Sequence, residues 1–157
     1  MGEGVHMKRI LVSACMLGIS CRYDGKEKPK EEVLKLLERE DIQLIPVCPE
    51  QWGGLQTPRL PSERRAGGVF NCEGGDVTEQ YERGARQTLK AAKLYGCKLA
   101  ILKERSPSCG KGRIYDGTFT GTLTDGNGVT AELLLEHDIK ILGESELEEL
   151  AEVLDTI

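Results

Sequence analysis

The sequence predicts a single α/β domain with a Rossmann-like, mainly parallel sheet flanked by helices and long functional loops. Four short apolar segments have the length and composition of buried strands, at residues 8–14, 42–47, 98–103 and 139–142. Segments with helical spacing of apolar residues lie between them, and this alternation builds right-handed βαβ units. With 157 residues, the chain has the size of one domain.

The spacing of apolar residues predicts the helices, and proline, capping-box and glycine residues predict where they begin and end. The first is expected to open at Pro29 and run to about Glu40. Asp76 and Glu79 form a capping box that opens the second, which Gly96 ends.

The last third of the sequence predicts two further helices. A short one is expected over 130–137, and Ser145 with Glu148 forms a second capping box that starts the C-terminal helix. The remaining segments, 49–75 and 104–129, are rich in glycine and read as long loops, the first of them with a hairpin expected around residues 69–72. Loops of such length in a compact domain tend to be functional.

Composition bounds the class of protein. Hydrophobic residues (39%) and charged residues (30%) occur in the proportions of a soluble globular domain. No apolar run approaches the roughly 20 residues of a transmembrane helix, and no signal-peptide pattern opens the chain, so we expect a cytoplasmic protein. Residues 1–7 are expected to be a disordered or cloning-derived tail before a single domain over 8–157. The net charge of −5 argues against a nucleic-acid partner.

Three of the six cysteines follow predicted strands: Cys15, Cys48 and Cys109. Ligands of an open parallel sheet bind beyond the carboxyl ends of its strands, so these thiols are expected to converge on one soft metal centre. A free cysteine is also often a small buried hydrophobe. The absence of a Cys-x-x-Cys pair disfavours a zinc finger, and the spacing matches no ferredoxin run.

The segment from Cys15 to Arg22 allows a second interpretation. A cysteine, a tight loop and an arginine after a strand also describe the phosphate-binding loop of a cysteine phosphatase. Here six residues, rather than five, separate the two, and a turn rather than a helix follows Arg22. Cys21 could instead form a redox dithiol with Cys15 or be a structural thiol. Cys72 and Cys97 are expected to be structural.

Two further residues lie close to the candidate ligands. Glu50, two residues after Cys48, is either a solvated carboxylate or a general base beside a metal. Ser106 lies in the tight loop that carries Cys109, where it either shapes a turn or hydrogen-bonds a substrate. Gly110 would allow a close approach of the backbone to a cluster. Asp116, Arg22 and Arg59 are polar loop residues that are expected to satisfy local backbone groups.

The chain resembles the thiouracil desulfurase family, formerly a domain of unknown function, from about Lys8 to the last helix. The motifs that carry this resemblance are Ser13-Ala14-Cys15 with Cys21-Arg22-Tyr23-Asp24-Gly25, Pro46-Val47-Cys48-Pro49-Glu50-Gln51 with Thr57-Pro58-Arg59, and Leu102-Lys103-Glu104-Arg105-Ser106-Pro107-Ser108-Cys109-Gly110 with Tyr115-Asp116-Gly117-Thr118-Phe119.

The resemblance implies a Rossmann-like fold and a [4Fe-4S] cluster held by Cys15, Cys48 and Cys109, with the fourth iron open to substrate sulfur. It places the catalytic carboxylate on Glu50 and the active-site serine on Ser106. The implied activity is non-redox desulfuration of a small thiobase such as 2-thiouracil, which yields the oxo base and sulfide. Such a chain is expected to receive its cluster from cluster-assembly machinery. The alternatives are a non-catalytic iron–sulfur or zinc-binding protein and, less favoured, the cysteine phosphatase.

Overall fold

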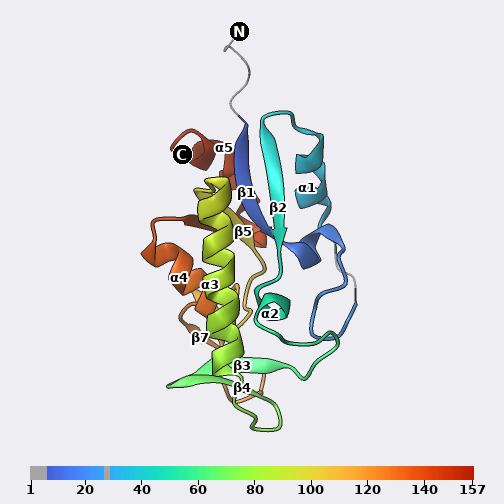
Figure 1. Cartoon of the computed structure of the whole chain (residues 1–157), viewed down its shortest axis with the longest axis vertical. Helices are drawn as coiled ribbons and strands as arrows, with labels where there is room; N and C mark the ends of the chain where they lie inside the picture. The colour runs from blue at the N-terminus through green and yellow to red at the C-terminus, as the bar shows by residue number, and fades with distance from the viewer. Residues whose placement is uncertain (1–6, 27–28) are drawn as a thin grey trace.

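A four-stranded parallel sheet forms the centre of the molecule in a computed structural model that describes residues 7–26 and 29–157 (Figure 1). Its strands are β1 (Lys8–Ser13), β2 (Ile42–Val47), β5 (Leu99–Leu102) and β8 (Lys140–Gly143), in the order β2-β1-β5-β8. All three strand pairs are parallel. The predicted α/β class and all four predicted sheet strands are confirmed. Residues 1–6 of the predicted tail lie outside the described residues.

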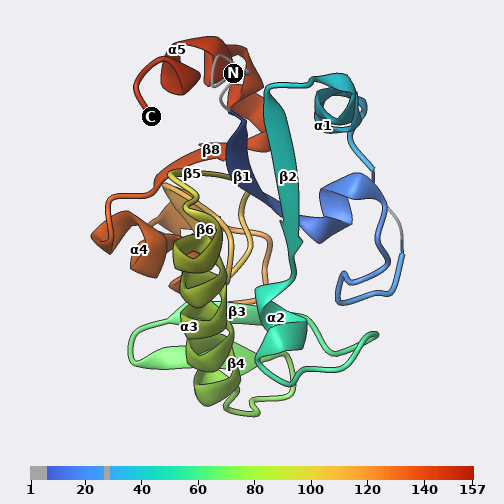
Figure 2. The ribbon, with the colours of Figure 1, turned by 45° about the horizontal axis from the view of Figure 1, so that its top comes forward.

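Alternating side chains of the sheet build two apolar layers. Leu11, Ala100 and Leu102 pack beneath the helices α3 (Thr78–Tyr95) and α4 (Val129–Glu136). Ile10 and Val12 belong to the opposite layer. That layer is covered by elements at the two ends of the chain: the 3₁₀ helices η1 (Ala14–Leu17) and η2 (Lys35–Glu38), and the α-helices α1 (Glu31–Leu34) and α5 (Leu150–Leu154). Helices thus cover both faces of the sheet, as expected (Figures 1 and 2).

The helices follow the predicted positions, but their starts differ. The predicted helix over 29–40 is one short turn of α-helix that continues as η2. Helix α3 ends at Gly96, whose left-handed φ of 66° lets its N–H bond the last turn, as predicted. The predicted capping box is wrong, because Val77 is the N-cap residue and the Asp76 carboxylate accepts the N–H of Thr78.

The second predicted capping box is also wrong. The C-terminal segment begins as the 3₁₀ helix η3 (Glu144–Glu149), and the Glu146 carboxylate, rather than that of Glu148, accepts the N–H of Gly143 over 2.9 Å. The Ser145 hydroxyl instead donates to Glu104. The carboxylate two residues earlier therefore satisfies the first amide.

The two long loops contain short ordered elements beyond the carboxyl ends of the sheet strands (Figure 1). The first holds helix α2 (Pro49–Trp52) and the antiparallel pair β3 (Ser62–Arg65) and β4 (Gly68–Asn71), which confirms the hairpin expected around 69–72. The second holds a hairpin of β6 (Arg113–Tyr115) and β7 (Leu123–Asp125), which the sequence did not predict. In the described part of the chain, no helix is long and apolar enough to cross a membrane.

Candidate metal centre

The three candidate ligand cysteines lie where three neighbouring strands end. Cys15 is in η1 directly after β1, Cys48 is the N-cap residue of α2 directly after β2, and Cys109 is in the loop after β5. The register pairs Ser13 with Val47, so β1 and β2 end side by side. From β1 the chain adds β2 on one side of the sheet, and it then crosses over to add β5 and β8 on the other side. The boundary between β1 and β5 is therefore the topological switch point, where open α/β sheets bind ligands.

The thiols are close enough to influence one another. The charge of Cys48 acts to raise the pKa of Cys15, and the charge of Cys15 acts to raise that of Cys109. All six cysteines of the chain are free. The topology places the three cysteines at the carboxyl edge of the sheet, and their convergence on one metal centre stays a prediction.

Cys21 lies between Cys15 and Cys48. Its side chain is 3% exposed, and its thiol shares hydrogen bonds with the thiols of both neighbours. These hydrogen bonds are the main reason that the pKa of Cys15 is lowered and that of Cys48 is lowered to about 7, while the pKa of Cys21 itself is raised. Cys21 thus keeps its proton, and its single S–H can be donated to one neighbouring thiolate at a time.

The loop that carries Cys109 is shaped by Ser106. The Ser106 hydroxyl oxygen accepts the backbone N–H groups of Ser108 and Cys109, both over 3.0 Å. A Cβ at Gly110 would press into the backbone of Ser106, so the tight turn itself requires glycine at this position. This contact accounts for Gly110 without a close approach of the backbone to a cluster. Burial is the main cause that raises the pKa of the Cys109 thiol.

Helix α4 fixes this loop from behind. The carbonyl groups of Pro107 and Ser108 accept the N–H groups of Val129 and Thr130, over 2.8 and 2.9 Å. These are donors of the first helical turn, which would otherwise lack partners. A Cβ at Gly128 would overlap the Ser108 carbonyl, so the loop and the helix start make direct backbone contact.

Glu50 is held from two sides. The Tyr81 hydroxyl donates to Oε2 of Glu50 over 2.7 Å, and Nη2 of Arg59 lies 3.2 Å from the same oxygen. Tyr81 comes from α3 and is 2% exposed, and its pKa is raised mainly by burial. The Glu50 side chain keeps 18% of its surface exposed, so the carboxylate combines fixed partners with access to solvent.

The position of Glu50 depends on close packing of two helices. A Cβ at Gly53, which ends α2, would overlap the carbonyl oxygen of Gln80 in α3, and a Cβ at Gly84 would overlap that of Pro49. Glycine at both positions lets the two backbones touch. This contact brings Glu50 within reach of the Tyr81 hydroxyl.

The described residues match known proteins over almost their whole length. The family model for 2-thiouracil desulfurase matches residues 10–146. The chain belongs to the 2-thiouracil desulfurase family. The uncharacterized protein YbbK of Bacillus subtilis is 42% identical over 151 residues, covering 90% of this chain and 99% of the relative. A solved structure, that of the [4Fe-4S]-dependent thiouracil desulfidase TudS, is also 42% identical, with a TM-score of 0.88 over 96% of this chain and 99% of its own.

The donor set of this desulfurase-family chain suits an iron–sulfur cluster. Among residues 7–26 and 29–157, no three His, Cys, Asp or Glu side chains converge on a point that could hold a single ion. A cubane cluster places each thiolate on a different iron, so its ligands need not meet at a point. Two buried donors in the same motifs, Nη1 of Arg22 and Nε of Arg59, have no acceptor within the described residues, as expected of groups facing an anion.

The phosphatase interpretation finds little support in this desulfurase-family fold. Arg22 pairs with Asp24 over 3.4 Å, and a turn follows it within the described residues 22–26, as the sequence predicted. A phosphate-binding loop needs that arginine for the phosphate, whereas here a carboxylate already pairs with it. Cys97, buried beside the sheet, fits its predicted structural role, whereas Cys72 is exposed.

Sequence reasoning missed Tyr81 and Lys103 and gave Arg59 too small a role. Arg59 does donate to the local carbonyl group of Gln56, as expected, but it also reaches the distant carbonyl of Cys21 and pairs with Glu50. The charge of Lys103, after β5, helps lower the pKa of Cys15. Lys103 is the last residue of the strand predicted over 98–103, and a charged residue at that strand end was the available signal. Tyr81 had no such signal in the sequence, because an aromatic residue on the apolar side of a helix is typical of the core.

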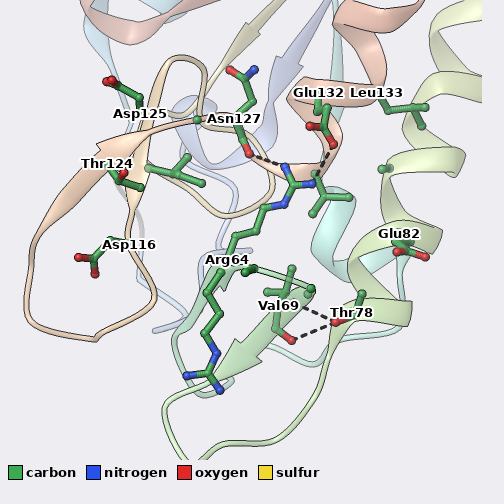
Figure 3. Close-up of a pocket in the computed structure, with 18 of the residues that line it drawn as sticks. Arg64, Val69, Thr78, Glu82, Asp116, Thr124, Asp125, Asn127, Glu132 and Leu133 are labelled. Carbon is green, nitrogen blue, oxygen red and sulfur yellow. Dashed lines mark hydrogen bonds and ion pairs between the residues drawn. The ribbon is translucent and has the colours of Figure 1, made fainter.

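A cavity of about 760 Å³ lies apart from the predicted site residues, none of which lines it (Figure 3). Its walls come from the β3–β4 hairpin, α3, α4 and the β6–β7 hairpin. Arg64 crosses it to bond the Asn127 carbonyl over 2.6 Å and the Glu132 carboxylate over 2.8 Å. The charged residues that line the cavity are of both signs, and its lining includes no cysteine.

Proposed function

We propose that this chain is a [4Fe-4S]-dependent desulfurase that converts a free thiobase, such as 2-thiouracil, into the oxo base with release of sulfide. Membership of the 2-thiouracil desulfurase family supports the activity. The similarity to TudS, which is described as [4Fe-4S]-dependent, supports the cofactor. The observation that carries the proposal is the delivery of three free thiols from β1, β2 and β5 to the switch point of the sheet.

Cys15, Cys48 and Cys109 would hold the cluster. When bound, the cluster supplies a soft, Lewis-acidic iron suited to thiocarbonyl sulfur. Cys48 is prepared as a ligand, because its pKa of about 7 makes the thiolate accessible near neutral pH. The loop around Ser106 keeps Cys109 in place through the two hydrogen bonds to its backbone.

Glu50 is proposed as the general base. It would take a proton from the water that attacks the thiocarbonyl carbon, a role that contributes about 10²–10⁴-fold in rate. Ser106 is proposed to orient the base or to relay a proton, since its oxygen already accepts two amides and its hydroxyl proton remains to be donated. The overall reaction exchanges sulfur for the oxygen of water and gives hydrogen sulfide, so it needs no electron donor.

A free thiobase fits this chain better than thiolated transfer RNA. The net charge of −5 opposes the phosphate backbone, whose binding needs a basic surface. We further propose that residues 8–157 act as one domain. The chain would receive its cluster from assembly machinery in a reducing cytoplasm, which is consistent with six free cysteines.

The test is anaerobic cluster reconstitution followed by incubation with 2-thiouracil, measuring the thiocarbonyl absorbance and the sulfide released. Wild type is expected to convert the base. Cys48→Ser should lose both cluster and turnover, whereas Glu50→Gln should keep the brown cluster and lose turnover at least about 100-fold. A loaded wild type that leaves thiouracil unchanged would instead indicate a non-catalytic iron–sulfur protein. Turnover of an aryl phosphate without metal would indicate the phosphatase.

A further inference from the structure

Arg59 carries a charge into the interior beside Glu50. Its side chain is 8% exposed, and its Nη2 lies 3.2 Å from both Oε2 of Glu50 and the carbonyl oxygen of Cys21. Nη1 donates to the Gln56 carbonyl and the Thr57 hydroxyl. The guanidinium therefore has its orientation set by four acceptors, and it connects the loop of Cys21 to the carboxylate.

The two partners of Glu50 bind the same oxygen. Tyr81 and Arg59 both contact Oε2, and no hydrogen bond to Oε1 is found among the residues that the structure describes. A carboxylate fixed through one oxygen has the other available to accept a proton. The partial exposure of Glu50 gives water access to the group, while Tyr81 and Arg59 remain buried behind it.

Arg59 is held here although its hydrogen bonding is incomplete. Its Nε is buried and has no acceptor in the described part of the chain. A buried donor without a partner destabilises the fold, so a neutral side chain of similar size would be easier to accommodate. The positive charge next to Glu50 is the property that distinguishes arginine from such a replacement.

We propose that Arg59, with Tyr81, is a positioning residue for Glu50: together they fix Oε2 and leave Oε1 as the atom that accepts the proton of the attacking water. The inference rests on the proposed function and extends it to two residues outside the proposed ligands and general base. The contacts of Arg59 and Tyr81 with Glu50 are thereby assigned to the chemical step rather than to substrate binding.

The experiment compares four variants after anaerobic reconstitution: Arg59→Gln, Arg59→Lys, Tyr81→Phe and Arg64→Gln. Arg64 is the matched control, since it also pairs with a glutamate, over 2.8 Å, but lies in the separate cavity of Figure 3. Three quantities are measured for each: kcat for 2-thiouracil, the Kd from the spectral change of the cluster on adding thiouracil, and iron content.

Arg59→Gln is expected to lower kcat about 100-fold, the size of effect that a small misplacement of a catalytic group produces, with Kd within about twofold of wild type. Arg59→Lys keeps the charge and should recover at least about tenfold of that loss. Tyr81→Phe should lower kcat about tenfold, and Arg64→Gln should leave it unchanged. Arg59→Lys and Tyr81→Phe test the inference even if Arg59→Gln does not fold.

Wild-type kcat in Arg59→Gln or in Tyr81→Phe would overturn the inference and leave the proposed function standing. The same holds if Arg59→Gln loses iron or thiouracil binding in proportion to kcat, because that pattern indicates a structural role. A loaded wild type without turnover overturns the proposed function, and this inference with it.

Discussion

The sulfur of Cys48 lies 3.7 Å from the carbonyl oxygen of Cys21, and the Cys21 thiol hydrogen-bonds the thiols of both Cys48 and Cys15. A fourth cysteine therefore lies among the three proposed ligands. Because its own pKa is raised while those of its neighbours are lowered, Cys21 is expected to stay protonated beside the proposed ligand thiolates.

Replacing Cys21 should therefore spare the cluster. Cys21→Ala keeps the three thiols delivered by β1, β2 and β5, so iron and sulfide content after anaerobic reconstitution are expected to match wild type. Cys48→Ser, the matched change at a proposed ligand, should lose the iron. Loss of iron in Cys21→Ala would show that the cluster needs the fourth thiol.

The reactivity of Cys48 should follow its lowered pKa. The thiolate is the reactive form, and a pKa of about 7 means that Cys48 is mostly protonated below pH 7 and mostly ionised above it. Alkylation of the cluster-free protein by iodoacetamide, followed site by site by mass spectrometry, should be half-maximal for Cys48 near pH 7. Cys97, whose pKa burial raises to about 11, should remain unmodified over about pH 6–9.

Cys21→Ala provides the control for this titration. The hydrogen bond from Cys21 is the main cause that lowers the pKa of Cys48, so its loss should move the half-maximal rate to higher pH, toward the ordinary thiol value of 9.0. An unchanged midpoint in Cys21→Ala would contradict the assigned cause.

The sequence predicted the sheet and the thiols for the same local reason. Leu99–Leu102 is a continuous apolar run that must be buried on both faces, and Gly96 ends the helix before it. A cysteine that follows such a run is placed at the sheet edge by the strand itself. The β6–β7 hairpin escaped prediction because each of its strands has three residues, several of them polar and exposed.

The surroundings of Glu50 could not be predicted in this way. Tyr81 is 31 residues from Glu50 in the sequence, and the two meet because glycines at 53 and 84 let α2 and α3 touch. Neither glycine has a positive φ that a turn pattern could reveal. Contacts of this kind depend on how helices pack, and a single sequence contains no local signal for them.

The contact between α2 and α3 predicts an unusual response at Gly84. Glycine to alanine within a helix normally stabilises by about 1 kcal/mol. Here the new Cβ would overlap the Pro49 carbonyl, so Gly84→Ala is expected to destabilise the fold by about 1–3 kcal/mol. Displacement of α2 should also lower turnover, because Glu50 moves with it. Urea unfolding measures the first effect, with Gln87→Ala on the exposed side of α3 as the control. A stabilised Gly84→Ala variant would rule out the close packing.

Ser106 should contribute to stability through its loop. Ser106→Ala removes the acceptor of two amides, those of Ser108 and Cys109, and is expected to cost about 1–3 kcal/mol in the free energy of unfolding. Ser106→Thr retains the hydroxyl and should restore most of that stability. If Ser106→Ala unfolds at the same urea concentration as wild type, the serine does not hold the Cys109 loop.

The central claim is that Cys15, Cys48 and Cys109 hold one [4Fe-4S] cluster with an iron left open to the sulfur of the substrate. Mössbauer spectroscopy of the anaerobically reconstituted, ⁵⁷Fe-labelled protein, recorded with and without 2-thiouracil, tests it most directly. The account predicts that one iron in four is distinct from the rest and that thiouracil changes the signal of that iron alone. Four equivalent irons that do not respond to thiouracil would contradict it.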